Sequence, residues 1–220
     1  MKLNLICALL ALGVGVAAHA DEFKINGTVK TGSCTPTFEN GGNFSIGRVS
    51  TAALTGTDVS NGYTYTTLSE VSHTLSLHCG SAAKVGLNFA DTKASSQIFT
   101  SKAEFGLGMD GTTKIGAYEI IPINSANVKV TIGGVPKSAV WTASTDSGVT
   151  WGRPRSGMMV FGEASEYWGI VDSVAPDWNP SSTTDMVFDL KVKPYINNAV
   201  ATLGHDINLN GQATISLHYF

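Results

Sequence analysis

The sequence predicts an all-β protein, a sandwich or barrel made of many short strands. Glycine, serine and threonine are plentiful and only 14% of the residues are charged, a composition that suits a β-rich extracellular protein with many turns. Apolar and polar residues alternate in several short runs that are separated by turn residues, as expected of strands with one buried face. No stretch has the periodicity of an amphipathic helix, and no internal repeat is found.

The first 20 residues are predicted to be a secretory signal peptide (residues 1–20). Lys2 precedes an almost wholly apolar run over residues 3–17, and Ala18-His19-Ala20 fits a cleavage site. An N-terminal membrane anchor is the alternative, but the apolar run is shorter than the roughly 20 residues that a span needs. We therefore expect an exported chain that starts at Asp21.

The cysteines fit an exported protein. Cys7 lies in the predicted signal peptide, which leaves Cys34 and Cys79. Two cysteines in an exported chain most simply form one disulfide. A redox pair or a metal site is the alternative, but the chain has no C-x-x-C and no second cluster of ligands.

Strand-like runs cover much of the chain. A turn at Gly80-Ser81 is expected to separate the runs 67–79 and 84–89, and Asp110-Gly111 is expected to connect the runs 105–109 and 114–123 as a hairpin. The run 186–192 is expected to end near Pro194. Residues 141–182, which hold all four tryptophans, are irregular, and we expect them to elaborate one domain. The expected strands are residues 67–79, 84–89, 105–109, 114–123, 127–132 and 186–192.

The two ends of the predicted mature chain carry the most regular alternation. Near the start, Phe23, Ile25, Gly27 and Val29 share one face, and near the end the odd-numbered residues of 207–219 share one face. A long alternating strand without an assigned partner is an aggregation hazard. The sequence pattern therefore predicts that each of these two strands packs against a partner, which alternation alone does not identify.

The two ends together resemble subunits of bacterial chaperone–usher fimbriae. The resemblance rests on an export signal, the run F-x-I-x-G-x-V before a first cysteine, a second cysteine at position 79, and a terminal strand whose penultimate residue is tyrosine. The stretches CTPTFENGG (34–42) and FGLGMDGTTKIGAYEI (105–120) look closer to an uncharacterised branch of exported β-rich proteins associated with chaperone–usher systems.

The resemblance implies an immunoglobulin-like sandwich that lacks its final strand. A periplasmic chaperone would fill the resulting groove first, and the N-terminal extension of a sister subunit or of another copy would then replace it. Residues 21–31 would be the donor strand, with Phe23, Ile25, Gly27 and Val29 facing the groove. Residues 32–220 would be the pilin-like β-sandwich domain, brought by an outer-membrane usher from the periplasm to the cell surface.

The resemblance also implies roles for residues near the cysteines and the terminal strand. Cys34 and Cys79 match the disulfide of the family. Ile207 stands where many such subunits have glycine, while Gly204 and Gly211 lie nearby. The mature chain is also longer than a typical shaft subunit. The residues that would flank the groove and face the chaperone are Ala213, Ile215, Leu217, Tyr219 and Phe220, the last through its carboxylate.

Two other functions stay open from the sequence. The chain could be a self-complete periplasmic β-sandwich binding protein whose first strand simply pairs within the domain. It could also be a glycan-binding minor or tip-proximal fimbrial subunit, because exposed aromatic rings suit sugar faces. Trp151, Trp168 and Trp178, near Arg153, Arg155 and Glu166, would line such a site, whereas the structural interpretation buries these rings in the core or over sheet edges.

The sequence offers no catalytic or cofactor motif, so we expect a protein that is not an enzyme and has no metal. Residues 106–111 fit G-x-G-x-x-G but lead into a strand-like run, so they predict a hairpin turn and not a dinucleotide site. His73 and His78 are five residues apart on one strand and face opposite sides. Removal of the signal leaves 13 basic against 17 acidic residues, without the basic patch that nucleic-acid binding needs.

Overall fold

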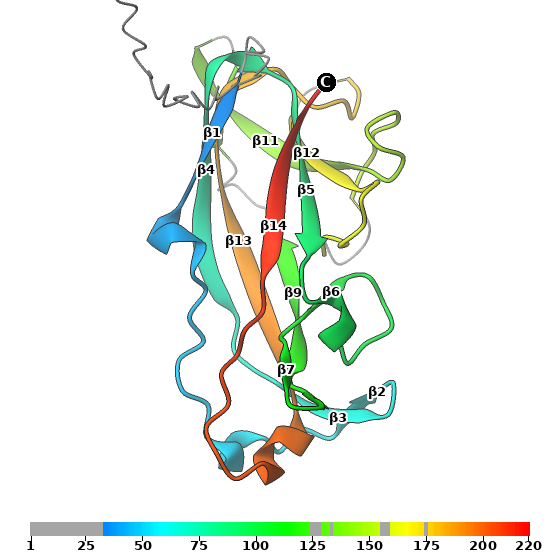
Figure 1. The fold of residues 1–220 in the computed structure, drawn as a ribbon. Helices are drawn as coiled ribbons and strands as arrows, with labels where there is room; N and C mark the ends of the chain where they lie inside the picture. The colour runs from blue at the N-terminus through cyan, green and yellow to red at the C-terminus, as the bar shows by residue number, and fades with distance from the viewer. Residues whose placement is uncertain (1–32, 124–128, 133, 155–158, 174–175) are drawn as a thin grey trace, which may run out of the picture.

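The computed structural model describes residues 33–123, 129–132, 134–154, 159–173 and 176–220. These residues confirm the all-β prediction: they form one 12-stranded sheet system and a separate two-stranded ribbon, with four short 3₁₀ helices as their only helical turns. Figure 1 shows the longest strands running along the long axis of the molecule. Among the described residues, none of the helices has the length and apolarity to cross a membrane.

Strands make up most of the regular structure, and the 3₁₀ helices lie in the connections between them. The strands are β1 (Cys34–Phe38), β2 (Asp58–Ser60), β3 (Tyr63–Thr67), β4 (Val71–Ala83), β5 (Val85–Asp91), β6 (Glu104–Gly106), β7 (Met109–Asp110), β8 (Thr113–Lys114), β9 (Gly116–Pro122), β10 (Lys129–Ile132), β11 (Val135–Ser144), β12 (Tyr167–Asp172), β13 (Thr183–Asn197) and β14 (Ala213–Tyr219). The 3₁₀ helices are η1 (Glu39–Gly42), η2 (Thr51–Ala53), η3 (Ala94–Ser96) and η4 (Asn198–Thr202).

The sheet curls into a nearly closed sandwich. Its strands follow the order β1-β4-β13-β10-β11-β12-β5-β14, and each neighbouring pair is antiparallel. The long strand β13 also pairs with β9 and β3 beyond this path. β1 and β14 are the two ends of the order, and each pairs with a single strand.

Trp141 lies at the centre of the core. Its ring centroid is 4.7 Å from that of Phe188 and 6.1 Å from that of Trp168, and its indole N–H donates to the carbonyl of Ile123 at 3.2 Å. A buried indole needs such a partner for its N–H. The same core cluster includes the inward-facing residues of the long strands: Leu75, Leu77, Val85, Leu87, Phe89, Met186 and Leu190.

The predicted disulfide is confirmed. Cys34 opens β1 and lies directly opposite Cys79 of β4 in the strand register, and their sulfurs are bonded with the Cα atoms 3.9 Å apart. The bond joins the first strand of the sheet to a central one, 45 residues further along the chain.

Two predicted strand ends are wrong, and each has a local cause. β4 continues through Gly80, whose N–H donates to the carbonyl of Ser33 at 3.2 Å, so the predicted turn at Gly80-Ser81 does not form. β13 passes Pro194, because β4 pairs with it only as far as Val192 and β3 pairs with it from Tyr195. The proline therefore lies where no neighbouring strand needs its N–H.

The terminal strand is shorter than predicted. The alternation begins at Ile207, but pairing begins only at Ala213, opposite Asp91, where β5 ends. The residues before Ala213 lie beside the segment that follows β6, since the N–H of Asn210 donates to the carbonyl of Leu107 at 3.0 Å.

The predicted hairpin around Asp110-Gly111 is confirmed. β6 pairs with β9, and β7 pairs with β8 through a turn in which Gly111 has φ +58°. The G-x-G-x-x-G run therefore makes a β-turn and opens no helix.

The disulfide yields a first prediction. Replacement of both Cys34 and Cys79 by alanine should lower the free energy of unfolding by about 4 kcal/mol, because the unfolded chain loses a closed loop. Urea unfolding of residues 21–220 would measure the loss, with the reduced wild-type chain as the control. An unchanged midpoint in both samples would contradict a stabilising bond.

Glu119 yields a prediction on pH. Its side chain is 9% exposed and lies opposite the equally buried Glu104, and burial, together with repulsion from Glu104, raises the pKa of Glu119 above its ordinary value. Ionised Glu119 therefore destabilises the fold, and this cost is fully present above the raised pKa and disappears as the pH falls below the unfolded value. Glu119→Gln should stabilise the protein at pH 7, with the gain shrinking towards pH 4.

Urea unfolding at both pH values would measure this difference between variant and wild type. The matched control is Glu163→Gln, which removes a carboxylate that pairs with Lys102 and does not act on Glu119, and which should give no stabilisation at pH 7. An equal effect of Glu119→Gln at pH 7 and pH 4 would refute the assignment.

Candidate functional site

A groove of about 1110 Å³ opens between the two ends of the sheet. One bank is the chain from Phe38 to Leu54, which follows β1, and the other is residues 205–215, which lead into β14. Figure 1 shows both banks running along the molecule, blue on one side and red on the other. The floor consists of core residues that also line the groove: Leu107, Tyr118, Ile120, Leu190, Val192, Ile196 and Val200.

The apolar side chains on the two banks are incompletely covered. They pack against the core yet stay half-buried, whereas on β5, at the other side of β14, Val85, Leu87 and Phe89 are at most 3% exposed. A row of half-covered apolar side chains in a groove marks a surface on which another chain can pack. These bank residues are Phe38, Phe44, Leu54, Ile207, Leu209, Ala213 and Ile215.

Within the described part of the chain, no strand pairs with the groove side of β14. The N–H of Phe220 donates to the carbonyl of Lys84, and the N–H of Thr92 donates to the carbonyl of Gln212, both at 3.1 Å. Hydrogen-bonded pairs alternate along an antiparallel ladder, so the even-numbered residues of this strand bond to β5. The N–H and C=O groups that point away from β5 are those of Ala213, Ile215, Leu217 and Tyr219.

The opposite edge, on β1, is different. The hydrogen bond from Gly80 to Ser33 sets the phase of the β1–β4 ladder, so the backbone groups of Cys34, Pro36 and Phe38 face away from β4. Pro36 has no N–H. The N–H of Cys34 donates to the hydroxyl of Tyr219 at 2.7 Å, and this bond joins the two edges beyond Phe38 and Ile215, which line the groove.

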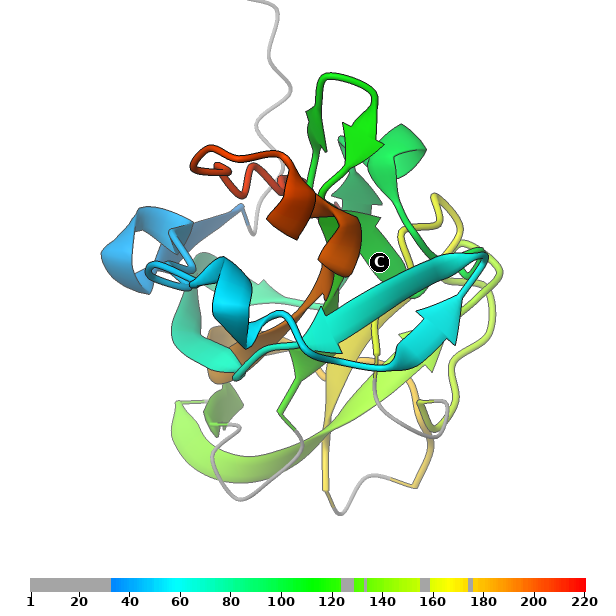
Figure 2. The ribbon, with the colours of Figure 1, turned by 90° about the horizontal axis from the view of Figure 1, so that it is seen from below.

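Side-chain hydrogen bonds also link the chain near the far end of the groove. Asn198 of η4 donates to the carbonyl of Gly56 and accepts from the hydroxyl of Thr66, both at 2.7 Å, and the same hydroxyl accepts from the N–H of Gly56 at 2.8 Å. Figure 2 shows η2 and η4 close together at this end of the molecule. These hydrogen bonds link η4 to the chain just after Leu54, and both Leu54 and Val200 of η4 line the groove.

Polar contacts hold both banks in place. On the β1 side, Glu39 accepts the N–H of Thr74 at 3.1 Å, which lowers the pKa of this carboxylate, and Phe44 meets the ring of His73 edge-on at 4.8 Å. On the β14 side, His205 pairs with Asp110 at 2.6 Å, and this bond raises the pKa of His205.

Gly211 lets the backbone of the β14 bank pack closely against the floor of the groove. A Cβ at this position would lie 2.6 Å from the ring of Tyr118 and 3.0 Å from Leu107, so only glycine lets the backbone approach so closely. The resemblance to fimbrial subunits implies a glycine at the position of Ile207 instead. Ile207 is a half-buried lining residue of the groove.

The structure brings together the residues predicted for the terminal strand, and Ala213 and Ile215 line the groove. The ring of Phe220 packs on Gly148 and Gly86 and lies 5.2 Å from that of Trp151. The predicted donor residues Phe23, Ile25, Gly27 and Val29 lie outside the described residues.

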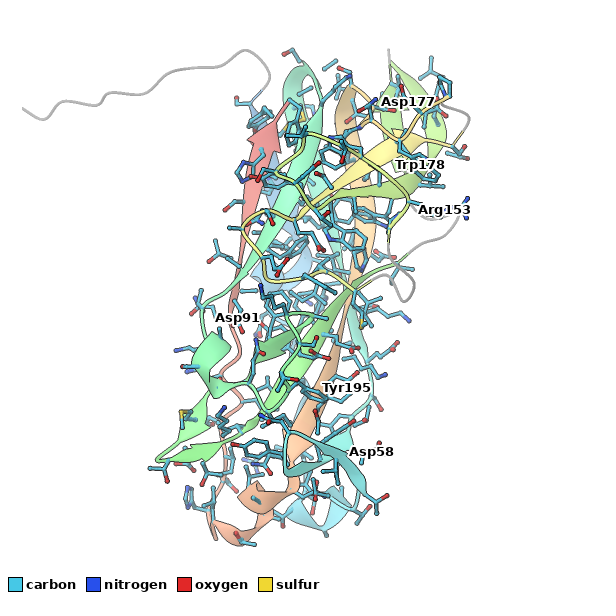
Figure 3. The ribbon with its side chains drawn as sticks, turned by 90° about the vertical axis from the view of Figure 1, so that its right-hand side faces the viewer. Asp58, Asp91, Arg153, Asp177, Trp178 and Tyr195 are labelled. Carbon is cyan, nitrogen blue, oxygen red and sulfur yellow. A yellow bond between two sulfur atoms is a disulfide. The ribbon has the colours of Figure 1, made fainter. Side chains whose placement is uncertain are left out.

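The predicted tryptophan site is spread over several packing contacts. Trp168 is 2% exposed, and its indole N–H donates to Glu166 at 2.7 Å. Trp151 packs against Phe220, and the guanidinium of Arg153 lies 5.4 Å from the ring centre of Trp178. Figure 3 shows Arg153 beside Trp178, far from Tyr195 and Asp58 at the other end. A small cavity of about 250 Å³ adjoins Trp151 and Trp168, and Arg155 lies outside the described residues.

Sequence reasoning missed the bank formed by residues 38–54. Its apolar residues Phe38, Phe44 and Leu54 follow no regular period, and three turn-forming glycines interrupt them. The sequence feature that could have indicated this bank is a series of single apolar residues among polar ones, directly after the strand that contains Cys34. Across the described residues, no group of three or more histidine, cysteine or acidic side chains is placed to hold a metal ion.

One family model matches part of the chain. It is described as "Protein of unknown function (DUF1120)" and covers residues 23–104, which is less than half of the sequence. The match includes both disulfide cysteines and the β1-side bank of the groove. No curated protein matches the chain.

The contact of Gly211 with the floor yields a prediction. Gly211→Ala should cost about 1–3 kcal/mol of stability, because its Cβ would press on the ring of Tyr118. Thermal unfolding would measure the loss. Gly80→Ala is the matched control, since a Cβ there meets no atom within 4 Å, and equal melting temperatures for the two variants would contradict the close approach.

Proposed function

We propose that the chain is a structural subunit of a surface fimbria and that its groove receives a β-strand from another subunit. The donor strand is residues 21–31 of a second copy or of a sister subunit, with Phe23, Ile25 and Val29 on the groove floor. The observation that carries the proposal is the groove itself, a slot of about 1110 Å³ beside the unpaired edge of β14. Strand addition supplies main-chain partners and side-chain pockets at once.

The dimensions of the donor and the edge agree. The alternating row from Phe23 to Val29 has the same length as β14, from Ala213 to Tyr219. Its apolar side chains would cover the half-buried residues of both banks, and Gly27 suits a place where the floor leaves no room for a Cβ. Three buried apolar side chains contribute about 1.5–3 kcal/mol each before the cost of ordering the segment.

A donor that runs antiparallel to β14 has to come from another chain. Val29 would then lie opposite Ala213, while Cys34 of the same chain is fixed beside Tyr219, about 20 Å further along the strand. The five Cα–Cα steps from Val29 to Cys34 reach about 18 Å when fully extended, and the chain would also have to reverse direction. A head-to-tail contact of this kind does not close on itself and builds a fibre.

An exposed edge and groove need protection before assembly. A periplasmic chaperone that lends a strand to β14 would provide it, and an outer-membrane usher would exchange that strand for the donor. In this proposal the chain is exported to the periplasm through residues 1–20 and ends on the cell surface. Neither catalysis nor a cofactor has a part in the mechanism.

The tryptophan region supports a packing role better than a glycan site. Trp168 is buried against Trp141, Trp151 meets Phe220, and Arg153 covers Trp178. Sugar binding needs free ring faces, whereas Trp168 is 2% exposed and the partly buried rings of Trp151 and Trp178 each have a protein side chain packed against them. The groove likewise favours an open subunit over a self-complete binding protein.

The test uses the chain from residue 21 to 220 with single changes in the donor segment. Ile25→Asp places a charge on the groove-facing row and should reduce the assembled fraction about tenfold or more. Thr28→Asp adds the same charge on the opposite row and should leave assembly intact. Sedimentation after refolding would measure the fraction, and equal assembly of both variants would refute the proposal.

A peptide of residues 21–31 provides the complementary measurement. It should bind the Ile25→Asp chain and raise its melting temperature, whereas the same peptide with Gly27→Arg should not. A chain that is stable alone and ignores the peptide would support the self-complete binding protein instead.

A further inference from the structure

The two edges of the groove offer unequal numbers of hydrogen-bond donors. β14 presents the N–H groups of Ala213, Ile215, Leu217 and Tyr219 to a strand in the groove, as its ladder with β5 dictates. Across the groove, β1 presents the groups of Cys34, Pro36 and Phe38. A strand between them meets a complete ladder on one side only.

Two of the three outward positions on β1 cannot donate. Pro36 has no N–H, and the N–H of Cys34 is taken by the hydroxyl of Tyr219 at 2.7 Å. Phe38 is left as the outward residue of β1 whose N–H can bond to a strand in the groove. A proline at an outward position is a known way to keep an edge from pairing.

We infer that β1 is closed to a full hydrogen-bond ladder with the strand in the groove, so that β14 alone sets the register of that strand. The inference rests on the proposed function and names the part of the groove that recognises the donor. The partner is an extended peptide with apolar residues at alternate positions.

The closed edge would also disfavour occupation of the groove by residues 21–31 of the same molecule. Residues 21–31 could enter it in the same molecule only by folding back as a hairpin against β1, since the span to Cys34 forbids the other direction. Such a hairpin would find one N–H donor, at Phe38, where a complete ladder needs three. Pro36 and Tyr219 thus keep the groove for another chain.

The direction of the donor strand determines which of its backbone N–H groups face β14 and which face β1. When both strands turn their apolar side chains to the floor, antiparallel pairing directs the N–H groups of the odd-numbered donor residues at β14 and those of the even-numbered residues at β1. Parallel pairing reverses this assignment. N-methylation of single peptide residues therefore reports the partner edge.

The experiment measures binding of peptides of residues 21–31 to the full chain that carries Ile25→Asp. N-methylation at Ile25 of the peptide should weaken binding about tenfold or more, because it removes a hydrogen bond and places a methyl group between paired strands. N-methylation at Asn26, the matched control, should weaken binding about threefold or less, because this amide faces β1.

A second arm changes the protein. Pro36→Ala returns an N–H to the β1 edge and should tighten binding of the unmodified peptide severalfold, whereas Thr37→Ala, whose N–H faces β4, should not. Tighter binding by the first variant alone supports the inference, and equal affinities for both overturn it.

The outcomes separate the inference from the proposed function. Equal losses at Ile25 and Asn26 would show that both edges pair, which overturns the inference while strand addition stands. Failure of the unmodified peptide to bind would overturn both.

Discussion

An antiparallel sheet that curls almost closed has to leave two edges, and in this protein both edges border one groove. The path from β1 to β14 runs through β4, β13, β10, β11, β12 and β5, with β9 paired beside it to β13, so within the described residues the sheet ends at β1 and at β14. The half-buried residues of the banks lie at these two ends of the sheet. Among the described residues, the strands with two partners bury the same kinds of residues almost completely.

The groove keeps its shape because its ends and banks are fixed by bonds outside it. Tyr219 and Cys34 join one end, Asn198 and Gly56 join the other, and Glu39 and His205 tie the banks to neighbouring elements. Binding to a preformed slot loses less conformational entropy than binding that must also order the receptor. The same bonds make the two edges unequal, because one of them uses an amide that a second strand would otherwise need.

The regular strands were predictable from alternation, whereas the groove was not. Leu75, Leu77 and Cys79 repeat every second residue and point inward as expected. Gly80 and Pro194 led to wrong strand ends because their effect depends on the neighbouring strand: Gly80 pairs with Ser33, and Pro194 lies between two partners. Residues 38–54 have no period to detect. Their role as a bank comes from long-range contacts such as that between Glu39 and Thr74, which no local pattern encodes.

The position of the disulfide has a mechanical consequence. Any pull on the segment before Ser33 enters the domain at Cys34, the first residue of β1. Without the bond, the load would peel the five residues of β1 from β4 one pair at a time. With it, the load passes through the sulfurs to Cys79 and into β4, a 13-residue strand held on both sides. In the proposed fibre, tension would therefore load the domain through its interior, and β1 would stay in place beside the groove.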